Sequence, residues 1–382
     1  MPSAIPRLFS RAPDCCDART DGVISADLAT AWSSMTGKAS ERGTLCVTVR
    51  NSLVGRLRMV VSLYSGARGM SLLGSPWTSD LIDWKGLCWV LQGAKTPVAV
   101  IIHAGVGWHT PSAKALITGQ GTRKARTGHP AHYIQISETL NLSDRPHTDD
   151  YTDTHLFIDE EDIYSFEKYR ESRESHPPRA TDIAVIETGE AVGVATYLIM
   201  APTIFGQGTG PFNGYSMQLP SMIADALGSG IVSGIEQGNT VWSHVHIRDL
   251  ASLFIVLLKK ICTGVTIPSG RKGIYFCETG EHSHREFSER LATAANEMGV
   301  LPSSDVKEIT LEEAAEKLVF GGGLNAELGY ASNARMKAIL GRRLGWMPLH
   351  GDHWGTTFHD EVSAFIKSPP GERDIPEFLR KH

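Results

Sequence analysis

Short apolar runs alternate with helical patterns along the middle of the chain. Val98–His103, Tyr133–Ile136 and Val194–Met200 are apolar runs of strand length. Such runs predict parallel strands that are buried on both faces. Apolar residues at helical spacing in Pro111–Gly121 and Thr181–Thr188 predict a helix between successive strands. The order strand, helix, strand, helix, strand predicts βαβ units and a parallel sheet.

After Gly206 the pattern becomes that of a smaller α/β lobe. A turn-rich loop, Gln207–Asn213, comes before a predicted helix over Met217–Leu227. A short predicted strand, Val241–Ile247, then leads into an amphipathic helix over Asp249–Ile261. The last predicted elements are a strand over Gly273–Cys277 and two helices that begin after the capping residues Ser283 and Thr310.

In the first 95 residues the apolar positions follow no sustained helix or strand periodicity. Thr44–Val49 and Arg58–Leu63 are short apolar stretches that each fit a strand, and Asp80–Leu91 fits a helix. We expect four regions in the chain: an atypical N-terminal region over residues 1–95, a sheet core over 96–206, a lobe interleaved with the last sheet strands over 207–350, and a peripheral tail over 351–382.

Composition and charge remove several function classes. The chain has 41% hydrophobic and 21% charged residues, which is typical of a globular protein. Its net charge of −5 gives no reason to expect nucleic acid or an anionic membrane as partner. It has no run of about 18 apolar residues, so no membrane span is expected. The six cysteines are scattered without a CxxC, which argues against a disulfide framework or a zinc site. We expect a cytoplasmic location, since no secretion signal is visible.

Four segments resemble those of extended short-chain dehydrogenases, the NAD-dependent epimerase/dehydratase-like family. Val98–Gly105 resembles that family's fourth strand and the turn beside the cofactor, and Tyr133–Thr139 resembles the fifth strand with its active-site hydroxyl. Ala201–Asn213 resembles the loop after the sixth strand, and Val241–Ala251 resembles the strand that enters the substrate lobe. The residues at 109–117 and 208–213 resemble those of a fungal-type subgroup of epimerase/dehydratase-like proteins.

The resemblance implies a Rossmann-like doubly wound parallel sheet with a smaller C-terminal α/β substrate lobe. It also implies NAD or NADP as cofactor and a small-molecule substrate, and it leaves a homodimer open. The site residues that it implies are His103, Ala104, Gly105, Pro202 and Thr203 at the cofactor, Ser137 and Thr139 in catalysis, and Phe205, Asn213 and His244 at the substrate. Serine and threonine also commonly end a strand, and Phe205 fits a hydrophobic turn equally well.

The family's catalytic Tyr-x-x-x-Lys pair has a literal match at Tyr164 and Lys168. Four-residue spacing on a helix puts both groups on one face, where the lysine lowers the pKa of the tyrosine for acid–base work. In the family this pair opens the helix that runs to the sixth strand, but prolines at 177 and 178 interrupt that path here. Arg179 and Ile183 stand at the expected positions. Tyr164 and Lys168 are therefore either a displaced catalytic pair or a chance surface pair.

The glycine-rich phosphate loop of the family, TGxxGxxG after a first strand, is not visible in residues 1–97. Gly66–Gly74 has neither the spacing nor a hydrophobic strand before it. We therefore expect the first βα unit to be atypical or missing. A misread exon is one explanation, and uncovered strand edges would then make the chain poorly soluble.

These features leave three functions open. The first is an NAD(P)-dependent oxidoreductase or isomerase that acts on a small metabolite, and the second is a catalytically silent Rossmann sensor or binding protein. The third is a chain with an aberrant N-terminus that has lost cofactor binding. We expect no metal site, because we interpret His103, His109, His244 and His246 as core or rim residues, with His244 and His246 on opposite faces of their strand.

Overall fold

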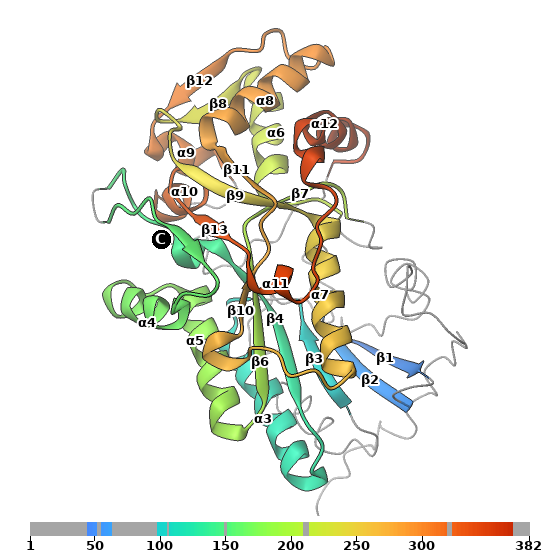
Figure 1. Ribbon diagram of the computed structural model, residues 1–382. Coiled ribbons are helices and arrows are strands. Elements are labelled where there is room, and N and C mark those ends of the chain that lie inside the picture. The colour runs from blue at the N-terminus through green and yellow to red at the C-terminus, as the bar shows by residue number, and fades with distance from the viewer. Residues whose placement is uncertain are drawn as a thin grey trace, which may run out of the picture.

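A computed structural model describes residues 44–51, 55–62, 98–104, 107–148, 151–208, 214–318 and 323–369. A six-stranded sheet fills the lower half of the molecule, in the order β1-β2-β3-β4-β6-β10 (Figure 1). All neighbours in this sheet pair parallel except β1 and β2, which pair antiparallel. The strands are β1 Thr44–Asn51, β2 Gly55–Ser62, β3 Val98–His103, β4 His132–Glu138, β6 Ala195–Ala201 and β10 Ile274–Phe276.

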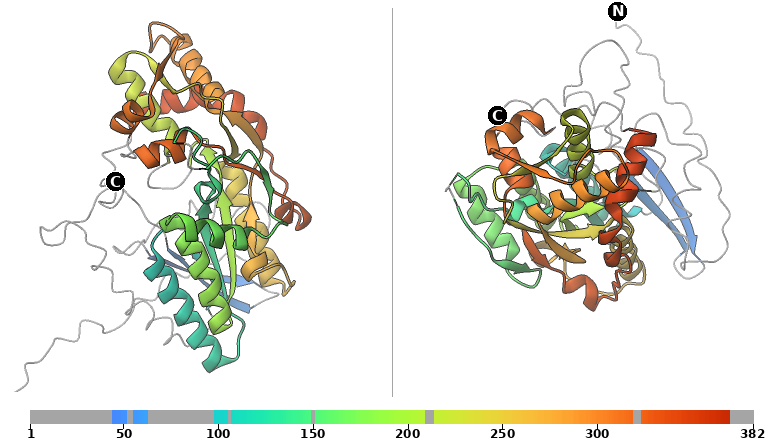
Figure 2. Two further views of the ribbon diagram at one scale, coloured as in Figure 1. Left: turned by 90° about the vertical axis from the view of Figure 1, so that its left-hand side faces the viewer. Right: turned by 90° about the horizontal axis from the view of Figure 1, so that it is seen from above.

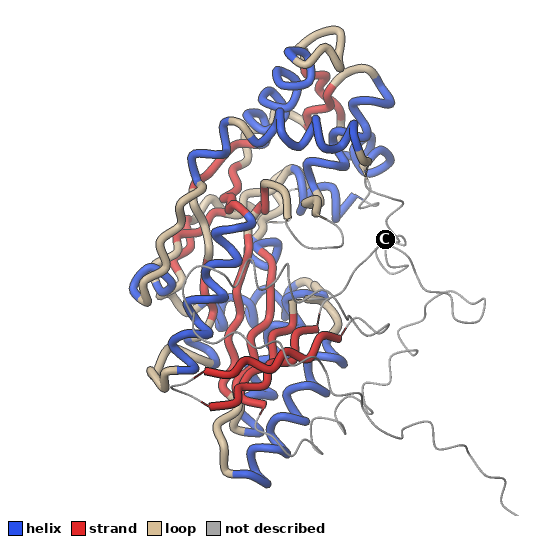
Figure 3. Tube along the Cα trace, turned by 90° about the vertical axis from the view of Figure 1, so that its right-hand side faces the viewer, coloured by secondary structure: helices blue, strands red, loops and turns tan. Residues whose placement is uncertain are grey.

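Helices cover both faces of the sheet. α3 (Thr110–Thr127) and α5 (Pro177–Val192) pack together on one face, and α7 (Ile247–Cys262) lies on the other (Figures 2 and 3). α5 begins with two prolines, which lack the amide hydrogens that the first turn leaves unbonded. It ends at Gly193, whose φ of 68° suits a left-handed cap. The α/β class with a parallel sheet is confirmed.

The central strands are buried on both faces, as continuous apolar runs require. Val100, Ile101, Ile134 and Ile199 are all fully inaccessible to solvent. Side chains of the helices complete this first core, to which Leu253 and Leu257 of α7 also belong. A strand that is covered on both sides must be apolar at every position, which is why these runs lack alternation.

The lobe has a second core of its own above the sheet (Figure 1). A three-stranded sheet, β11-β9-β7, joins it to the first core, and a two-stranded sheet, β12-β8, lies at its top. The elements of the lobe are β7 Thr203–Phe205, α6 Gln218–Ser229, β8 Val232–Ile235, β9 Val241–His246, β11 Gly280–Ser283, α8 His284–Glu297, β12 Val306–Ile309, α9 Leu311–Lys317, α10 Gly323–Tyr330, the 3₁₀ helix η5 Gly351–Gly355 and α12 Thr357–Lys367.

Shorter elements connect the sheet to the lobe. They are the 3₁₀ helices η3 Thr139–Leu142 and η4 Gly270–Lys272, the strands β5 Leu156–Ile158 and β13 Arg335–Lys337, which pair parallel, and the helices α4 Ile163–Arg173 and α11 Leu340–Arg343. α4 and α5 are separate helices, as the two prolines predicted. α5 is longer than the predicted Thr181–Thr188, because proline is accepted in the first turn of a helix.

The N-terminal part departs from a βα unit where it is described. β1 and β2 form an antiparallel pair, and β2 then lies parallel beside β3, so no helix separates these first two strands. Gly66–Gly74 and the predicted helix Asp80–Leu91 lie outside the described residues. Among the residues that the structure describes, no helix is long and apolar enough to span a bilayer.

Candidate functional site

The carboxyl ends of β2, β3, β4, β6 and β10 lie along one edge of the sheet, because these strands are parallel. The lobe stands over this edge, and β7 and β9 lie above β4 and β6 (Figure 1). Ligands of open α/β sheets bind outside the carboxyl ends of the strands. The candidate site is therefore this edge, together with the loops that follow its strands.

Ser137 is the polar side chain at the end of β4 that the sequence predicted for catalysis. Its hydroxyl donates a hydrogen bond to the Oδ2 atom of Asp182 on α5. The amide of Asn141, in η3, donates to Asp182 Oδ2 at 2.9 Å and to Glu167 Oε1 on α4 at 3.1 Å. Ser137 retains 6% exposure, whereas Asn141, Glu167 and Asp182 are fully buried. The four side chains form the carboxyl cluster of the site.

Burial controls the protonation of this cluster. Loss of hydration raises the pKa of Asp182 to about 8, against the hydrogen bonds from Ser137 and Asn141, which lower it. Burial and the neighbouring negative charge of Asp182 raise the pKa of Glu167 well above its usual range. Two carboxyl groups in contact cannot both ionise easily away from water. The cluster therefore keeps at least one proton at neutral pH.

Thr139 follows the same strand, but its hydroxyl, unlike that of Ser137, makes no hydrogen bond to a described residue. Its side chain is 1% exposed, and its hydroxyl has no hydrogen-bond partner among the described residues. A buried hydroxyl without a partner costs about 1–3 kcal/mol. Thr139 therefore stays a predicted site residue with an uncommitted hydroxyl beside Ser137.

Tyr164 and Lys168 lie on α4, and both contact Glu187 of α5. The Tyr164 hydroxyl donates to Glu187 Oε1 at 2.9 Å, and the Lys168 ammonium donates to the same oxygen at 2.8 Å. Arg271 lies over the Tyr164 ring, 4.7 Å from its centroid. Burial and the Glu187 carboxylate raise the pKa of Tyr164, although Lys168 acts in the opposite direction. This environment disfavours the phenolate that a Tyr/Lys pair uses in catalysis.

The predicted cofactor residues have their side chains largely engaged within the protein. His103 Nδ1 lies 2.7 Å from the Tyr133 hydroxyl and 3.3 Å from Gln135 Oε1, and burial lowers its pKa to about 4. Thr203 donates to Gln218 Oε1 at 2.9 Å. Ala104 is half-buried and Pro202 is buried, while Gly105 lies outside the described residues.

The predicted substrate residues Phe205 and His244 belong to an aromatic cluster in the lobe. The Phe205 ring centroid is 5.5 Å from that of His244, 5.2 Å from that of His246 and 5.1 Å from that of Trp354. The expectation that His244 and His246 point to opposite faces was wrong, because residues two apart on a strand share a face. Asn213 lies outside the described residues.

The histidines of this aromatic cluster are held neutral by burial. His244 Nδ1 lies 3.1 Å from His282 Nδ1, and the His244 ring stacks on Trp354 at 4.1 Å. Burial lowers the pKa of His244 and of His246 to about 4. Gly206 has a φ of 83°, and a Cβ there would stand 2.4 Å from His246 Nε2, so this turn requires glycine. No set of side chains suited to a metal ion occurs within the described part of the chain.

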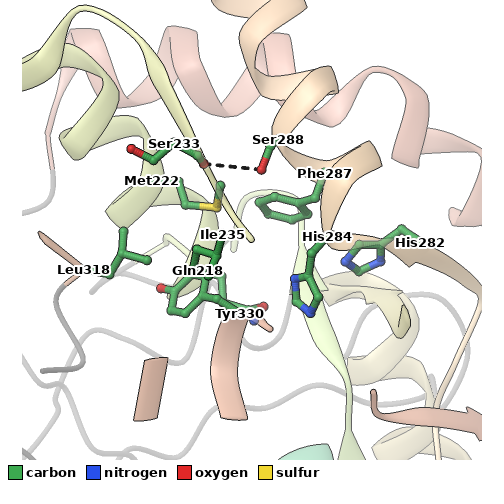
Figure 4. A pocket seen from close by; sticks show the side chains of 10 residues that line it. All are labelled: Gln218, Met222, Ser233, Ile235, His282, His284, Phe287, Ser288, Leu318 and Tyr330. Atoms are coloured by element: carbon green, nitrogen blue, oxygen red, sulfur yellow. Dashed lines mark hydrogen bonds between the residues drawn. The ribbon is translucent and has the colours of Figure 1, made fainter. Parts of the chain in front are cut away.

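A small cavity lies in the lobe beside this cluster (Figure 4). Its volume of about 20 Å³ is enough for a water molecule but far below the several hundred Å³ of a metabolite pocket. Buried His284 lines the cavity, and its Nε2 atom has no hydrogen-bond partner in the described residues. The other lining residues are Gln218, Met222, Ser233, Ile235, His282, Phe287, Ser288, Leu318 and Tyr330.

Sequence reasoning missed most of the carboxyl cluster. Asp182, Asn141 and Glu167 are not among the site residues that the sequence predicted. A usable signal was present at Asp182, which lies between the apolar positions of a helix that must cover the sheet. An acidic residue on such a face needs a partner, and the nearest strand end carries Ser137.

Comparison with known sequences finds partial matches only. No family model matches the chain. A curated protein named Oxidase ucsJ, from Acremonium sp, is 24% identical over 165 residues, and Uncharacterized protein C2A9.02 from Schizosaccharomyces pombe is 28% identical over 156 residues. Each match covers 41% of this chain, and the chain spans only 46% and 45% of the lengths of these relatives.

Solved structures of similar fold include nucleotide-sugar enzymes and a reductase. A dTDP-glucose 4,6-dehydratase from Bacillus anthracis, in complex with NAD, is 14% identical with a TM-score of 0.47, over 75% of this chain and 78% of that one. Vestitone reductase from alfalfa (Medicago sativa) is 17% identical with a TM-score of 0.41, over 73% and 79%. The fungal-type subgroup stays a prediction.

Proposed function

We propose that this protein binds NAD or NADP at the carboxyl edge of its sheet and acts on a hydroxyl or carbonyl group of a small metabolite, as an oxidoreductase or isomerase. One observation carries the proposal: Ser137 stands at the carboxyl end of a central parallel strand, beneath the lobe, with its hydroxyl bonded to a buried carboxyl group. A serine so placed can hydrogen-bond a substrate oxygen and pass on its proton.

The described residues fit the reacting end of a dinucleotide better than its phosphates. Ala104 follows β3 and Pro202 follows β6, on either side of β4, and both can line a flat ring at the edge. The uncommitted Thr139 hydroxyl can bond a carboxamide or a substrate oxygen. In a Rossmann fold the pyrophosphate lies at the turn after the first strand of the sheet core. The residues that follow β2 lie outside the described part of the chain. When bound, the nicotinamide would supply the hydride chemistry.

The remaining predicted residues take supporting roles in this proposal. His103 and Thr203 would border the cofactor, and Phe205 and His244, which are buried in the aromatic cluster, would support the substrate side from within the lobe. Gly105 and Asn213 keep the cofactor and substrate roles that the resemblance gives them. Neutral imidazoles such as that of His244 can donate or accept a hydrogen bond but add no charge, which suits an uncharged polar substrate.

A titration tests the proposal directly. NADH and NADPH are added separately to the purified full chain, and quenching of its tryptophan fluorescence is followed to saturation. We expect saturable binding of one of the two, with little change in Ser137→Ala, whose side chain would meet the substrate rather than the phosphates. Absence of saturable binding of either would refute the proposal.

A catalytically silent dinucleotide-binding protein is the second candidate. The contacts of Tyr164 and Lys168 with Glu187 favour it, because they raise the pKa of the tyrosine instead of lowering it. The two candidates differ in turnover. Dinucleotide binding with neither a change in nicotinamide absorbance nor an altered or isomerised substrate in chromatography, in the presence of mixed sugars, ketones and secondary alcohols, would favour the silent protein.

A further inference from the structure

The carboxyl cluster brings together four elements behind the end of β4. β4 contributes Ser137, η3 contributes Asn141, α4 contributes Glu167 and α5 contributes Asp182. The two carboxyl groups have no exposed surface. Their charge therefore has to be balanced by neighbouring groups or removed by protonation, because ionised carboxylates without water or partners are very unfavourable.

The cluster has fewer hydrogen-bond donors than its carboxyl oxygens can accept. Asp182 Oδ2 accepts from Ser137 and Asn141, and Glu167 Oε1 accepts from the same amide nitrogen. Among the residues that the structure describes, none donates a hydrogen bond to the second oxygens, Asp182 Oδ1 and Glu167 Oε2. Since one nitrogen binds both groups, their oxygens lie at most two hydrogen-bond lengths apart. A proton held between the carboxyls joins them and satisfies the unbonded oxygens.

The charged groups around Glu167 and Asp182 can stabilise only one of the two carboxyl groups in its ionised form. Arg179 of α5 donates to the Asn141 carbonyl at 3.3 Å and acts as a positive charge on Glu167. From β4, Glu138 adds negative charge at Asp182, and the neutral Tyr133 also faces it. η3 carries no titratable side chain, and α4 adds Glu171, which pairs with Arg179 at 3.7 Å, so the guanidinium can balance at most one carboxylate of the pair.

We propose that, in mildly alkaline solution, Glu167 and Asp182 share one proton and that the ionised Asp182 exchanges a further proton with the hydroxyl of Ser137, so that the pair is the acid–base group of the site. In the exchange the Oγ–H bond of Ser137 breaks, its proton moves to Asp182 Oδ2 and its electron pair stays on Oγ. In the same step Oγ takes the proton of a substrate hydroxyl, so that no free serine alkoxide forms and the electron pair of the broken bond stays on the substrate oxygen. The exchange with substrate rests on the function proposed above, whereas the shared proton does not.

Glu167 is the member of the pair that carries the proton. Its hydrogen bond to Asp182 raises its own pKa and lowers that of Asp182. Asp182 also accepts from Ser137 and Asn141, and all three contacts stabilise its ionised form. Asp182 and Glu167 act on the substrate only through Ser137, and they are positioning residues.

Infrared spectroscopy of the full chain tests the shared proton. At about pH 9.5, where Asp182 is almost fully ionised, we expect the carbonyl stretch of a protonated carboxyl group, which is lost in Glu167→Gln. Glu361 and Asp159, whose pKa values burial raises to about 7 and about 6, are ionised there and do not contribute. Glu187→Gln, which removes a half-exposed carboxylate, should leave the band unchanged. Absence of the band in the wild type, or its survival in Glu167→Gln, would overturn the proposal.

The titration of Asp182 tests its coupling to Ser137. Ser137→Ala removes a donor that lowers the pKa of Asp182, so the midpoint of the infrared titration should shift to higher pH. Thr139→Val, which removes a neighbouring hydroxyl without a partner, should leave the midpoint unchanged. An unmoved midpoint in Ser137→Ala contradicts the exchange. Failure of the wild type to bind NADH or NADPH would instead refute the proposed function and leave the shared proton intact.

Discussion

At the scale of single residues, buried polar groups decide how this protein responds to its surroundings. Asp182 is covered completely, yet it accepts hydrogen bonds from two elements and touches a second carboxyl group. Its folded-state pKa, about 8, lies far above the value of an exposed aspartate. Such a group prefers its proton in the folded state, so proton release opposes folding.

Replacement of Asp182 by asparagine should flatten the pH dependence of stability. In the wild type this group stabilises the fold fully below about pH 4, and the stabilisation is lost as pH rises towards about 8. The loss is at most about 1.4 kcal/mol per pH unit within that window. Urea unfolding of both proteins between pH 5 and about pH 8 measures the difference. Equal slopes in wild type and Asp182→Asn would contradict the raised pKa.

At the scale of elements, the side chain of Asp159 holds three segments of the chain together through hydrogen bonds to backbone amides. Asp159, just after β5, accepts from the backbone amide of Phe276 at 3.1 Å through Oδ2. Through Oδ1 it accepts from the amides of Ile339 at 2.8 Å and Leu340 at 3.1 Å. The carboxylate thereby ties β10 and the start of α11 to the end of β5.

Removal of this carboxylate should destabilise the protein strongly. Asp159→Ala leaves three amides without their acceptor, with an expected loss of about 3–5 kcal/mol in the free energy of unfolding. Asp159→Asn keeps one acceptor oxygen, which can still serve Ile339 and Leu340, so its loss should be smaller. Denaturant unfolding at one pH compares the two variants. Equal losses in the free energy of unfolding would contradict the view that these three hydrogen bonds stabilise the protein.

Close packing of α3 on α5 depends on a glycine. A Cβ at Gly121 of α3 would stand 2.5 Å from the Cβ atom of Val192 on α5. We expect Gly121→Ala to lower the free energy of unfolding by about 1–3 kcal/mol, because the helices must move apart. Gly228→Ala is the matched control, since its site in α6 is open and alanine favours helix. An unchanged free energy of unfolding in Gly121→Ala would contradict this, because it would mean that α5 can move away from α3 without loss of stability.

At the scale of the whole molecule, the lobe is closed by its C-terminal segment. Trp354 of η5 packs against Phe205, His244 and His282, with ring centroids within 5.1 Å. Glu361 of α12 accepts from the Gly206 amide at 2.9 Å. The segment after residue 350 therefore completes the second core, and the neutral imidazoles beside it are part of that core.

Acidification should loosen this closure before it loosens the sheet. The pKa of His244 falls from 6.5 to about 4 on burial, and that of His282 falls well below its usual value. Their stabilising contribution is full above pH 6.5 and is lost as pH falls towards 4. Hydrogen exchange, corrected for intrinsic rates, should show weaker protection of Thr357–Lys367 at about pH 5 than at pH 7, with no loss of protection in α5, where Asp182 gains its proton. Equal protection at both pH values would contradict this.

The amino-acid sequence by itself determined the class of fold. β3 has the predicted bounds Val98–His103, and β4, β6 and α7 lie within a few residues of their predicted ranges. Burial on both faces requires uninterrupted apolar runs, and such runs are visible without a structure. The break before α5 was visible as well, because proline cannot continue a preceding helix, although it is accepted in the first turn of the next one.

Only the tertiary structure decided which polar groups meet. Ser137 was singled out from its strand, but its partners Asn141 and Asp182 come from two other elements, and Glu167, which Asn141 also bonds, comes from a third. Tyr164 and Lys168 share the spacing of a catalytic pair, yet both contact Glu187. Spacing along a chain reports neighbours within one helix, whereas burial and charge pairing depend on how helices pack on the sheet. That packing sets the pKa values, and with them the chemistry available at the end of β4.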